Sequence, residues 1–289
     1  MLTKTRLRQN LTDVGIILLL IALGLLTPRS VSAHGGGGGG STVDPDTISY
    51  DQNVNAQLPL NVSLTDETGR TVQLSQYFGT KPVILIFAYY NCTMLCNLAL
   101  SDLAQNLKSL QSSAGTDFQV LTISFNAQET PQMAAAKKAA YMQIYDRPEA
   151  AQGWHFLVGK QDAIDQLTKT AGFHYVWDAA TKEFAHPTGV IVLSPGGKIM
   201  RYIFGINYNA TDLRLALLDA TNKKTASVID QVFLLCYHYN PVNGKYDLAI
   251  NNIIRIAGMG SAALLAGFIL WLHKRTEAKS FSNSQAHGH

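Results

Sequence analysis

Cys92 and Cys96 stand four residues apart in the stretch 89–98, which reads YYNCTMLCNL. Cysteines at this spacing share one face of a helix, but their β-carbons lie about 5 to 6 Å apart, whereas a relaxed disulfide needs about 3.5 to 4.5 Å. A direct disulfide therefore requires Cys92 to lie in the loop before the helix, or some strain. A metal ion between the sulfurs relaxes this constraint, because each metal–sulfur bond spans about 2.3 Å. The spacing is compatible with a redox couple, a metal site or two buried cysteines.

His186 is the histidine best placed to join the two cysteines. The chain has eight histidines, of which His155 and His174 lie inside or beside apolar segments, as satisfied core or surface histidines do. His186 comes just before a predicted strand at 189–194, so we expect it at an edge of the sheet. Two thiolates and one imidazole form a soft, low-coordinate ligand set, which suits Cu(I) better than zinc, since structural zinc normally takes four protein ligands.

The elements around the cysteines favour a functional site. Residues 82–88 form a continuous apolar run that is typical of a central strand covered on both faces. Leucines at helical spacing follow, and they predict a helix that begins near the cysteines and ends before Ser112. Ligand sites in open α/β sheets collect at the carboxyl ends of strands, and a helix N-terminus favours the thiolate form of cysteine.

The rest of the pattern predicts a mixed-sheet α/β domain over residues 51–225. The predicted segments are a hairpin (58–64 and 71–74), further strands (118–125, 189–194 and 198–204) and further helices (131–145, 162–171 and from Asn209 or Thr211 to Ala220). A Pro-Gly-Gly turn joins the last two strands, so we expect them to be antiparallel.

Both ends of the chain indicate export and membrane attachment. Residues 1–33 combine basic residues, an apolar run and a small-residue cleavage site, which predicts a signal peptide or an N-terminal anchor. Residues 34–50 are a glycine-rich linker. The apolar segment 253–273 predicts a C-terminal transmembrane helix in the cell membrane. Its basic flank places the tail 274–289 in the cytoplasm and the domain on the periplasmic or extracytoplasmic side.

The remaining cysteine lies in the membrane-proximal segment 226–252, where Cys236 and His238 are separated by one residue. Both are ligands for soft metals, so they could offer copper a second docking point. The aromatic residues around them favour a different prediction, in which this segment packs at the membrane interface and holds the domain over the bilayer.

Composition limits the remaining function classes. A chain of 289 residues with 47% hydrophobic residues can bury one main domain and still supply tails or membrane segments. Its formal net charge is only +3, and its 23 lysines and arginines are scattered, so nucleic-acid binding has little support. Three cysteines are too few for a disulfide-stapled scaffold.

The ordered set of motifs resembles the SCO/SenC family. The matching motifs extend over most of the domain and are Cys92-x-x-x-Cys96, residues 120–125 followed by Glu129-Thr130-Pro131, residues 153–159, His186, residues 194–198, Arg201-Tyr202 and Gly205. The resemblance implies a membrane-tethered, thioredoxin-like copper protein: a mixed sheet flanked by helices, with copper, Cu(I) or Cu(II), bound by Cys92, Cys96 and His186. It also implies a role in assembling the dinuclear copper site of cytochrome c oxidase.

The chain differs from the family pattern at three positions. Thr93 and Asn97 follow the cysteines, where the family usually has proline. Asn126 stands after the second buried strand, where many members have an acidic residue. The loop that carries the cysteines is therefore expected to be shaped differently, and Asn126 cannot act as a carboxylate in copper transfer.

The sequence thus predicts a copper metallochaperone rather than an enzyme. Its expected partners are the copper-bearing subunit of cytochrome c oxidase, the membrane, and an upstream copper donor or thiol reductant. The alternative is a membrane-anchored thiol–disulfide oxidoreductase that keeps oxidase cysteines reduced, with Cys92 attacking and Cys96 resolving. His186 separates the two, because copper binding needs its imidazole and dithiol exchange does not. A third hypothesis is a structural or copper-sensing partner that binds copper without delivering it.

Overall fold

The computed structural model describes residues 43–44, 47–92, 95–221 and 237–248, and also 254–255, 257–261, 263–265, 267–268 and 271. The predicted signal segment 1–33, the tail 274–289, Thr93 and Cys236 lie outside these residues, as does the side chain of His238. The predicted span 253–273 is described only in part. Within the described part of the chain, no helix has the length and apolar character needed to cross a membrane.

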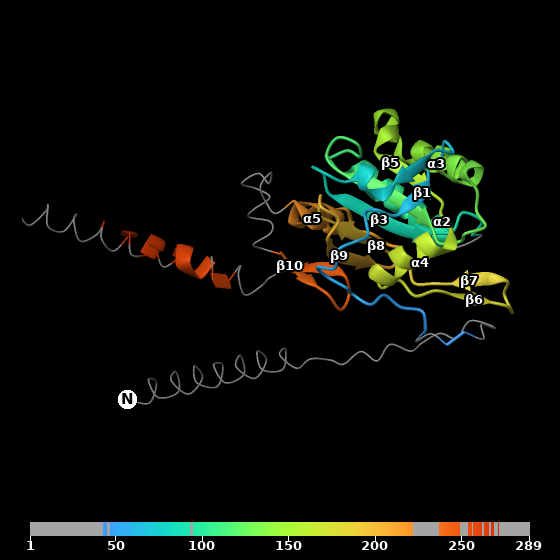
Figure 1. Ribbon diagram of the computed structural model, residues 1–289. Helices are drawn as coiled ribbons and strands as arrows, with labels where there is room; N and C mark the ends of the chain where they lie inside the picture. Colours follow the sequence, from blue (N-terminus) through green and yellow to red (C-terminus); the bar gives the residue numbers. More distant parts are fainter. Residues whose placement is uncertain are drawn as a thin grey trace, which may run out of the picture. The chain divides into compact units, whose positions relative to one another are not determined.

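A five-stranded mixed sheet forms the centre of the domain (Figure 1). Its strand order is β5-β4-β3-β8-β9, with bounds Trp154–Leu157, Gln119–Ser124, Val83–Ala88, Gly189–Leu193 and Ile199–Phe204. The β3–β4 and β4–β5 pairs are parallel, whereas β3–β8 and β8–β9 are antiparallel. Every residue of β3 is buried, which confirms the central strand predicted from its continuous apolar run.

The four α-helices among the described residues of the domain begin and end close to the predicted positions. They are α2 (Leu95–Ser109), α3 (Pro131–Tyr145), α4 (Gln161–Thr170) and α5 (Ala210–Ala220). Thr130 caps α3 by accepting a hydrogen bond from the Met133 amide at 3.4 Å, and Pro131 occupies the first turn, where a missing N–H costs nothing. Asn209 caps α5 through the Thr211 amide at 2.8 Å, which decides between the two candidate caps.

Three two-stranded hairpins accompany the sheet, of which only the first was predicted from the sequence. They are β1–β2 (Ser63–Thr65 and Thr71–Gln73), β6–β7 (Val176–Asp178 and Glu183–Ala185) and β10–β11 (Tyr237–Asn240 and Lys245–Leu248). Short 3-10 helices, η2 (Leu74–Tyr77) and η3 (Pro148–Gln152), follow β2 and precede β5. Because β5, β6 and β7 have only three or four residues each, they carry too little alternation to be recognised alone.

The β10–β11 hairpin covers the edge strand β9. The Tyr239 hydroxyl accepts a hydrogen bond from the Tyr202 amide at 3.2 Å and donates one to the Tyr202 carbonyl at 2.5 Å. The Tyr246 hydroxyl donates to Asp219 on α5 at 2.9 Å. These aromatic residues therefore pack on the domain itself and satisfy part of the exposed ladder of β9.

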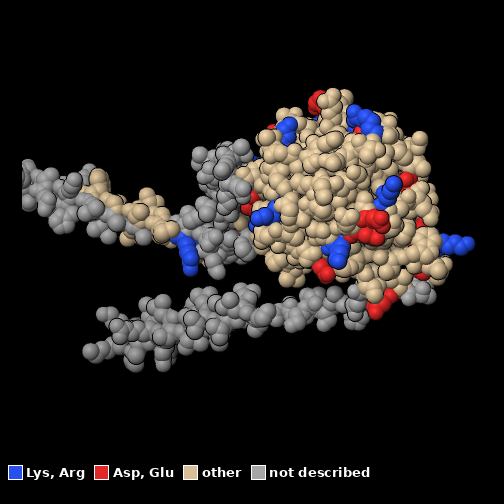
Figure 2. Space-filling view, in the orientation of Figure 1, with Lys and Arg blue, Asp and Glu red and all other residues tan. Residues whose placement is uncertain are grey.

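The domain begins at the end of the predicted linker. Tyr50 forms an isolated bridge with Phe173, and its ring lies 5.4 Å from Phe173 and 5.6 Å from Tyr202. On the face shown in Figure 2, lysines and arginines are interspersed with acidic residues instead of forming one basic patch. This distribution agrees with the small net charge.

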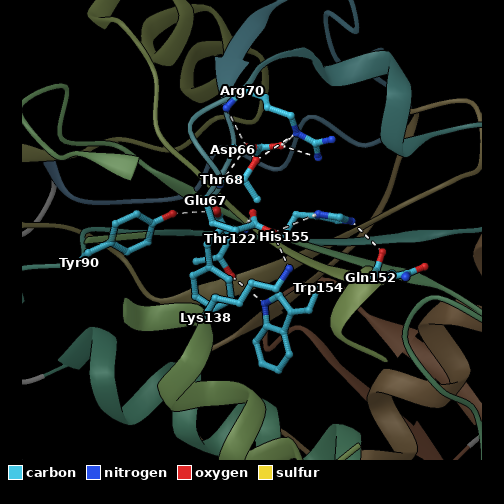
Figure 3. Close-up of polar contacts among 11 residues, drawn as sticks. Asp66, Glu67, Thr68, Arg70, Tyr90, Thr122, Lys138, Gln152, Trp154 and His155 are labelled. Atoms are coloured by element: carbon cyan, nitrogen blue, oxygen red, sulfur yellow. Dashed lines mark hydrogen bonds and ion pairs between the residues drawn. The ribbon is translucent and has the colours of Figure 1, made fainter. Parts of the chain in front are cut away.

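Glu67, in the β1–β2 turn, ties that hairpin to α3 and β5 (Figure 3). Its carboxylate pairs with Lys138, lies 3.7 Å from His155 Nδ1 and accepts a hydrogen bond from the Phe156 amide at 3.1 Å. Burial alone would raise the pKa of Glu67, but hydrogen bonds from His155 and Lys138 outweigh it and lower that pKa to about 2. The charged carboxylate is therefore the form that the fold stabilises.

Acidification is expected to weaken the fold through Glu67. Because its pKa is lower in the folded state, its contribution to the free energy of unfolding is present above about pH 5 and is lost as pH falls towards 2. The Glu67→Gln variant should lose about 2 to 3 kcal/mol at pH 7 and show a flatter pH dependence. Urea unfolding from pH 7 to pH 3 measures both. The control Asp146→Asn, which removes an exposed pair with Lys108, should behave like the wild type, and equal slopes for Glu67→Gln and the wild type would contradict the assignment.

Candidate metal centre

The parallel pairing of β3 and β4 brings the site together. Ala88, the last residue of β3, is in register with Ser124, the last residue of β4. The chain continues from β3 into the cysteine loop and from β4 into the segment that leads to α3. Both loops therefore meet at the carboxyl edge of the sheet, where ligand sites of α/β proteins collect.

The two cysteines lie at the junction of this loop and α2. Cys92 precedes the helix, which begins at Leu95, and Cys96 lies in its first turn. The Cys96 amide donates a hydrogen bond to Cys92 Sγ at 3.4 Å. Neither cysteine forms a disulfide, and both thiols are buried, with exposed fractions of 6% for Cys92 and 3% for Cys96. The loop placement of Cys92 meets the condition that the sequence set for a direct disulfide, so the geometry is compatible with redox chemistry as well as with metal binding.

His186 joins the cysteines from the segment between β7 and β8. Its Nε2 lies 3.3 Å from Cys96 Sγ, and its Nδ1 lies 2.9 Å from the Pro187 carbonyl oxygen. A carbonyl can only accept, so Nδ1 is the donor in this contact, and in the neutral imidazole the lone pair is then on Nε2, which faces the Cys96 sulfur. This is the tautomer in which a histidine ligates a metal through Nε2. No peptide bond in the described part of the chain is cis, including the one before Pro187.

The environment of Cys96 favours the neutral thiol. Its hydrogen bond with Cys92 and its burial raise the pKa of the Cys96 thiol far above the usual value. A metal ion or an attacking reagent must therefore displace a proton when it reaches this sulfur, so binding is coupled to proton release.

Aromatic rings enclose the imidazole. Their centroids lie 5.0 Å (Phe125), 6.0 Å (Tyr89) and 6.1 Å (Phe173) from that of His186. The Tyr89 hydroxyl donates a hydrogen bond to Glu183 of β7 at 2.7 Å, which ties the cysteine loop to the strand that leads to His186. An apolar enclosure of this kind restricts water and suits a soft metal bound by sulfur and nitrogen.

Glu129 is the main supporting residue whose role sequence reasoning missed. Its two carboxylate oxygens accept hydrogen bonds from the Tyr90 and Asn91 amides, both at 2.7 Å, and from the Ser124 hydroxyl at 2.5 Å. Glu129 is 7% exposed. The available signal was an acidic residue following the carboxyl end of a strand expected to lie beside β3. The two amide bonds hold the cysteine loop and the Ser124 bond ties Glu129 to the end of β4, so the carboxylate anchors the loop to the sheet.

Asn126 forms part of the wall beside the site. The side-chain Oδ1 of Asn126 accepts a hydrogen bond from the main-chain N–H of Gln128 at 3.1 Å. The main-chain N–H of Asn126 donates to Ser124 Oγ at 3.1 Å. It lines a cavity of about 550 Å³ with Tyr89, Asn91 and the β6–β7 hairpin residues Trp177, Lys182, Glu183 and Phe184. Asn126 thus stabilises the turn that leads to Glu129.

The other two candidate histidines lie elsewhere, as predicted. His155, on β5, contacts the Gln152 carbonyl at 2.9 Å, and His174 contacts Asp51 at 2.8 Å. Among the described residues, no three His, Cys, Asp or Glu side chains are already arranged to hold a metal ion. The structure thus brings together the three predicted residues, with a direct contact between Cys96 and His186, and three-ligand binding requires local rearrangement of these side chains.

A family model matches the part of the chain that holds Cys92 and Cys96, and several solved structures also match the chain. The SCO1/SenC family model matches residues 51–217. No curated protein sequence matches the chain. A crystal structure of a proposed electron transfer protein from Aquifex aeolicus VF5 is 28% identical, with a TM-score of 0.53, and the match covers 60% of this chain and 97% of that one.

Two further solved structures are more distant. One is Arabidopsis thaliana ScoI with copper bound, at 19% identity and a TM-score of 0.42, over 56% of this chain and 91% of that one. The other is BsSco, described as a member of the Sco family of cytochrome c oxidase assembly proteins, at 17% identity and a TM-score of 0.46, over 61% of this chain and 99% of that one.

Proposed function

Because this chain belongs to the SCO1/SenC family, we propose that it binds copper and acts in the assembly of cytochrome c oxidase. The family match covers residues 51–217, which include the whole five-stranded sheet together with Cys92 and Cys96. The mixed sheet and flanking helices of this domain correspond to the thioredoxin-like Sco fold.

The proposed ligands are the sulfurs of Cys92 and Cys96 and Nε2 of His186. The observation that carries this assignment is the 3.3 Å contact between His186 Nε2 and Cys96 Sγ, with Nδ1 engaged by the Pro187 carbonyl. Two sulfurs and one nitrogen leave Cu(I) with low coordination, so an incoming ligand of the recipient can bind before all the donor bonds break. Copper is the cargo in this proposal, and it passes by ligand exchange to the copper-bearing subunit of the oxidase.

A second candidate function is thiol–disulfide exchange, with Cys92 attacking and Cys96 resolving. The observation that favours it is the pair of reduced thiols at a loop–helix junction, where the Cys96 amide faces Cys92 Sγ. A hydrogen bond from an amide stabilises a thiolate at Cys92, which is the attacking form. In this role the protein would keep oxidase cysteines reduced and would draw electrons from an upstream thiol reductant.

Location and partners complete the proposal. The N-terminal segment 1–33 would export the chain, and the apolar segment 253–273 would anchor it in the cell membrane, with the copper site on the extracytoplasmic side. An upstream copper donor would load the site. Protease accessibility of the domain in intact spheroplasts tests this location, because a cytoplasmic domain would be protected.

Anaerobic titration of the reduced chain with Cu(I), against a competing chelator, tests the proposed function. We expect one tightly bound copper per chain, and loss of tight binding in the Cys92→Ser/Cys96→Ser variant. The absence of tight binding in the wild type would overturn the copper proposal. Rapid reduction of a mixed-disulfide substrate by a chain that binds no copper would instead support thiol exchange.

A further inference from the structure

Asn97 connects the cysteine loop to helix α3. Its Nδ2 donates a hydrogen bond to the Cys92 carbonyl at 3.0 Å. Its Oδ1 accepts hydrogen bonds from Lys137 Nζ at 2.7 Å and from the Tyr141 hydroxyl at 3.0 Å. One amide side chain, directly after Cys96, therefore bridges the main chain of Cys92 and two residues one turn apart on another helix.

The partners fix the orientation of this amide. Lys137 has only donors, so it must face Oδ1, and the Cys92 carbonyl has only acceptor capacity, so it must face Nδ2. Tyr141 adds a second donor on the Oδ1 side, and burial raises the pKa of its hydroxyl to about 12, which keeps it protonated. A reversed amide would lose the hydrogen bonds with Lys137 and with the Cys92 carbonyl.

The far end of the bridge is rigid. Tyr141 is 4% exposed, and its ring is stacked parallel to that of Phe156 on β5, with centroids 6.1 Å apart. Helix α3 is capped at Thr130 and is tied through Lys138 to Glu67. Asn97 thus transmits the position of a well-packed helix to the carbonyl of the first cysteine.

We propose that Asn97 is the positioning residue that holds Cys92 in place for copper, and that its Nδ2 hydrogen bond controls how fast copper leaves. The inference rests on the proposed copper function. Glu129 fixes the start of the loop at Tyr90 and Asn91, and Asn97 fixes its end at Cys92. Movement of the Cys92 sulfur away from the metal requires the Cys92 main chain to leave this second anchor or its side chain to change rotamer.

The Asn97→Asp variant separates positioning from helix packing. An aspartate still accepts from Lys137 and Tyr141, so the contact between α2 and α3 remains, but it cannot donate to the Cys92 carbonyl. We expect the full chain with Asn97→Asp to release Cu(I) to a chelator about 10-fold faster than the wild type, and Asn97→Ala to do the same. The thermal midpoint of the metal-free Asn97→Asp protein should stay close to that of the wild type.

A copper-free measurement distinguishes this inference from the proposed function. Amide hydrogen exchange at Cys96, whose N–H faces Cys92 Sγ, should be faster in Asn97→Asp. The control Asn106→Ala removes a half-buried asparagine of the same helix, which is bonded to Asp102, and should change neither quantity. If the wild type binds copper but Asn97→Asp releases it at the wild-type rate, the inference is overturned. If the wild type binds no copper while exchange at Cys96 is faster in the variant, the copper function fails and the positioning of Cys92 by Asn97 stands.

Discussion

Replacing His186 with alanine is expected to weaken Cu(I) binding by about 100-fold or more, because losing even an outer-shell partner of a metal ligand costs about 10- to 100-fold. The imidazole nitrogen next to Cys96 Sγ is the only proposed ligand that is not a sulfur. Its removal leaves two thiolates, which bind copper without the third donor that would fix its position. Competition titration with a Cu(I) chelator under anaerobic conditions measures the change.

His174→Ala is the matched control, because this histidine lies on the surface against Asp51 and should have no effect on copper affinity. Reduction of a mixed-disulfide substrate, measured on the same His186→Ala protein, should keep most of the wild-type rate, since dithiol exchange needs the cysteines and not the imidazole. An affinity for Cu(I) that is indifferent to His186 would refute the three-ligand site.

Replacing Glu129 with alanine is expected to lower the free energy of unfolding by about 4 kcal/mol. The substitution leaves the buried Tyr90 amide and the part-buried Asn91 amide without their acceptor, and each unsatisfied group costs about 1 to 3 kcal/mol, less where water can enter. Because the two amides belong to Tyr90 and Asn91, the loop that carries Cys92 should also loosen. Urea unfolding at pH 7 measures the loss of stability. Cu(I) titration of the folded fraction measures how far the loosened cysteine loop weakens copper binding.

Glu149→Ala provides the comparison for Glu129, because it removes an exposed glutamate from η3 and should change stability little. Glu129→Gln keeps one acceptor and should be less destabilised than Glu129→Ala. A Glu129→Ala protein as stable as the wild type would show that the loop is not held by this carboxylate.

An element could be predicted from the sequence when residues within or next to it mark its type and its ends. Helix α3 was predicted with the correct ends because Thr130 and Pro131 mark its start locally. Strand β3 was predicted from its apolar run alone. The β10–β11 hairpin was missed although Asn243-Gly244, a strong hairpin signal, lies in its turn. The contacts of Tyr239 and Tyr246 with Tyr202 and Asp219 depend on residues far away in the chain, and the membrane-interface role of the aromatic segment stays a prediction.

Residue types and their spacing are enough to indicate the candidate site, which has two cysteines at a strand–helix junction and a histidine before another strand. These are local facts of residue type and spacing, and the family match agrees with them. How the three residues meet depends on the fold, because the direct contact joins Cys96 to His186, which is 90 positions away in the chain. The fold also shows that Glu129 and Asn97 hold the cysteine loop. Glu129 binds main-chain amides of a loop almost forty residues earlier, and Asn97 binds two side chains of helix α3. Packing brings these groups together, and the residues next to Glu129 or Asn97 in the sequence do not indicate the contacts.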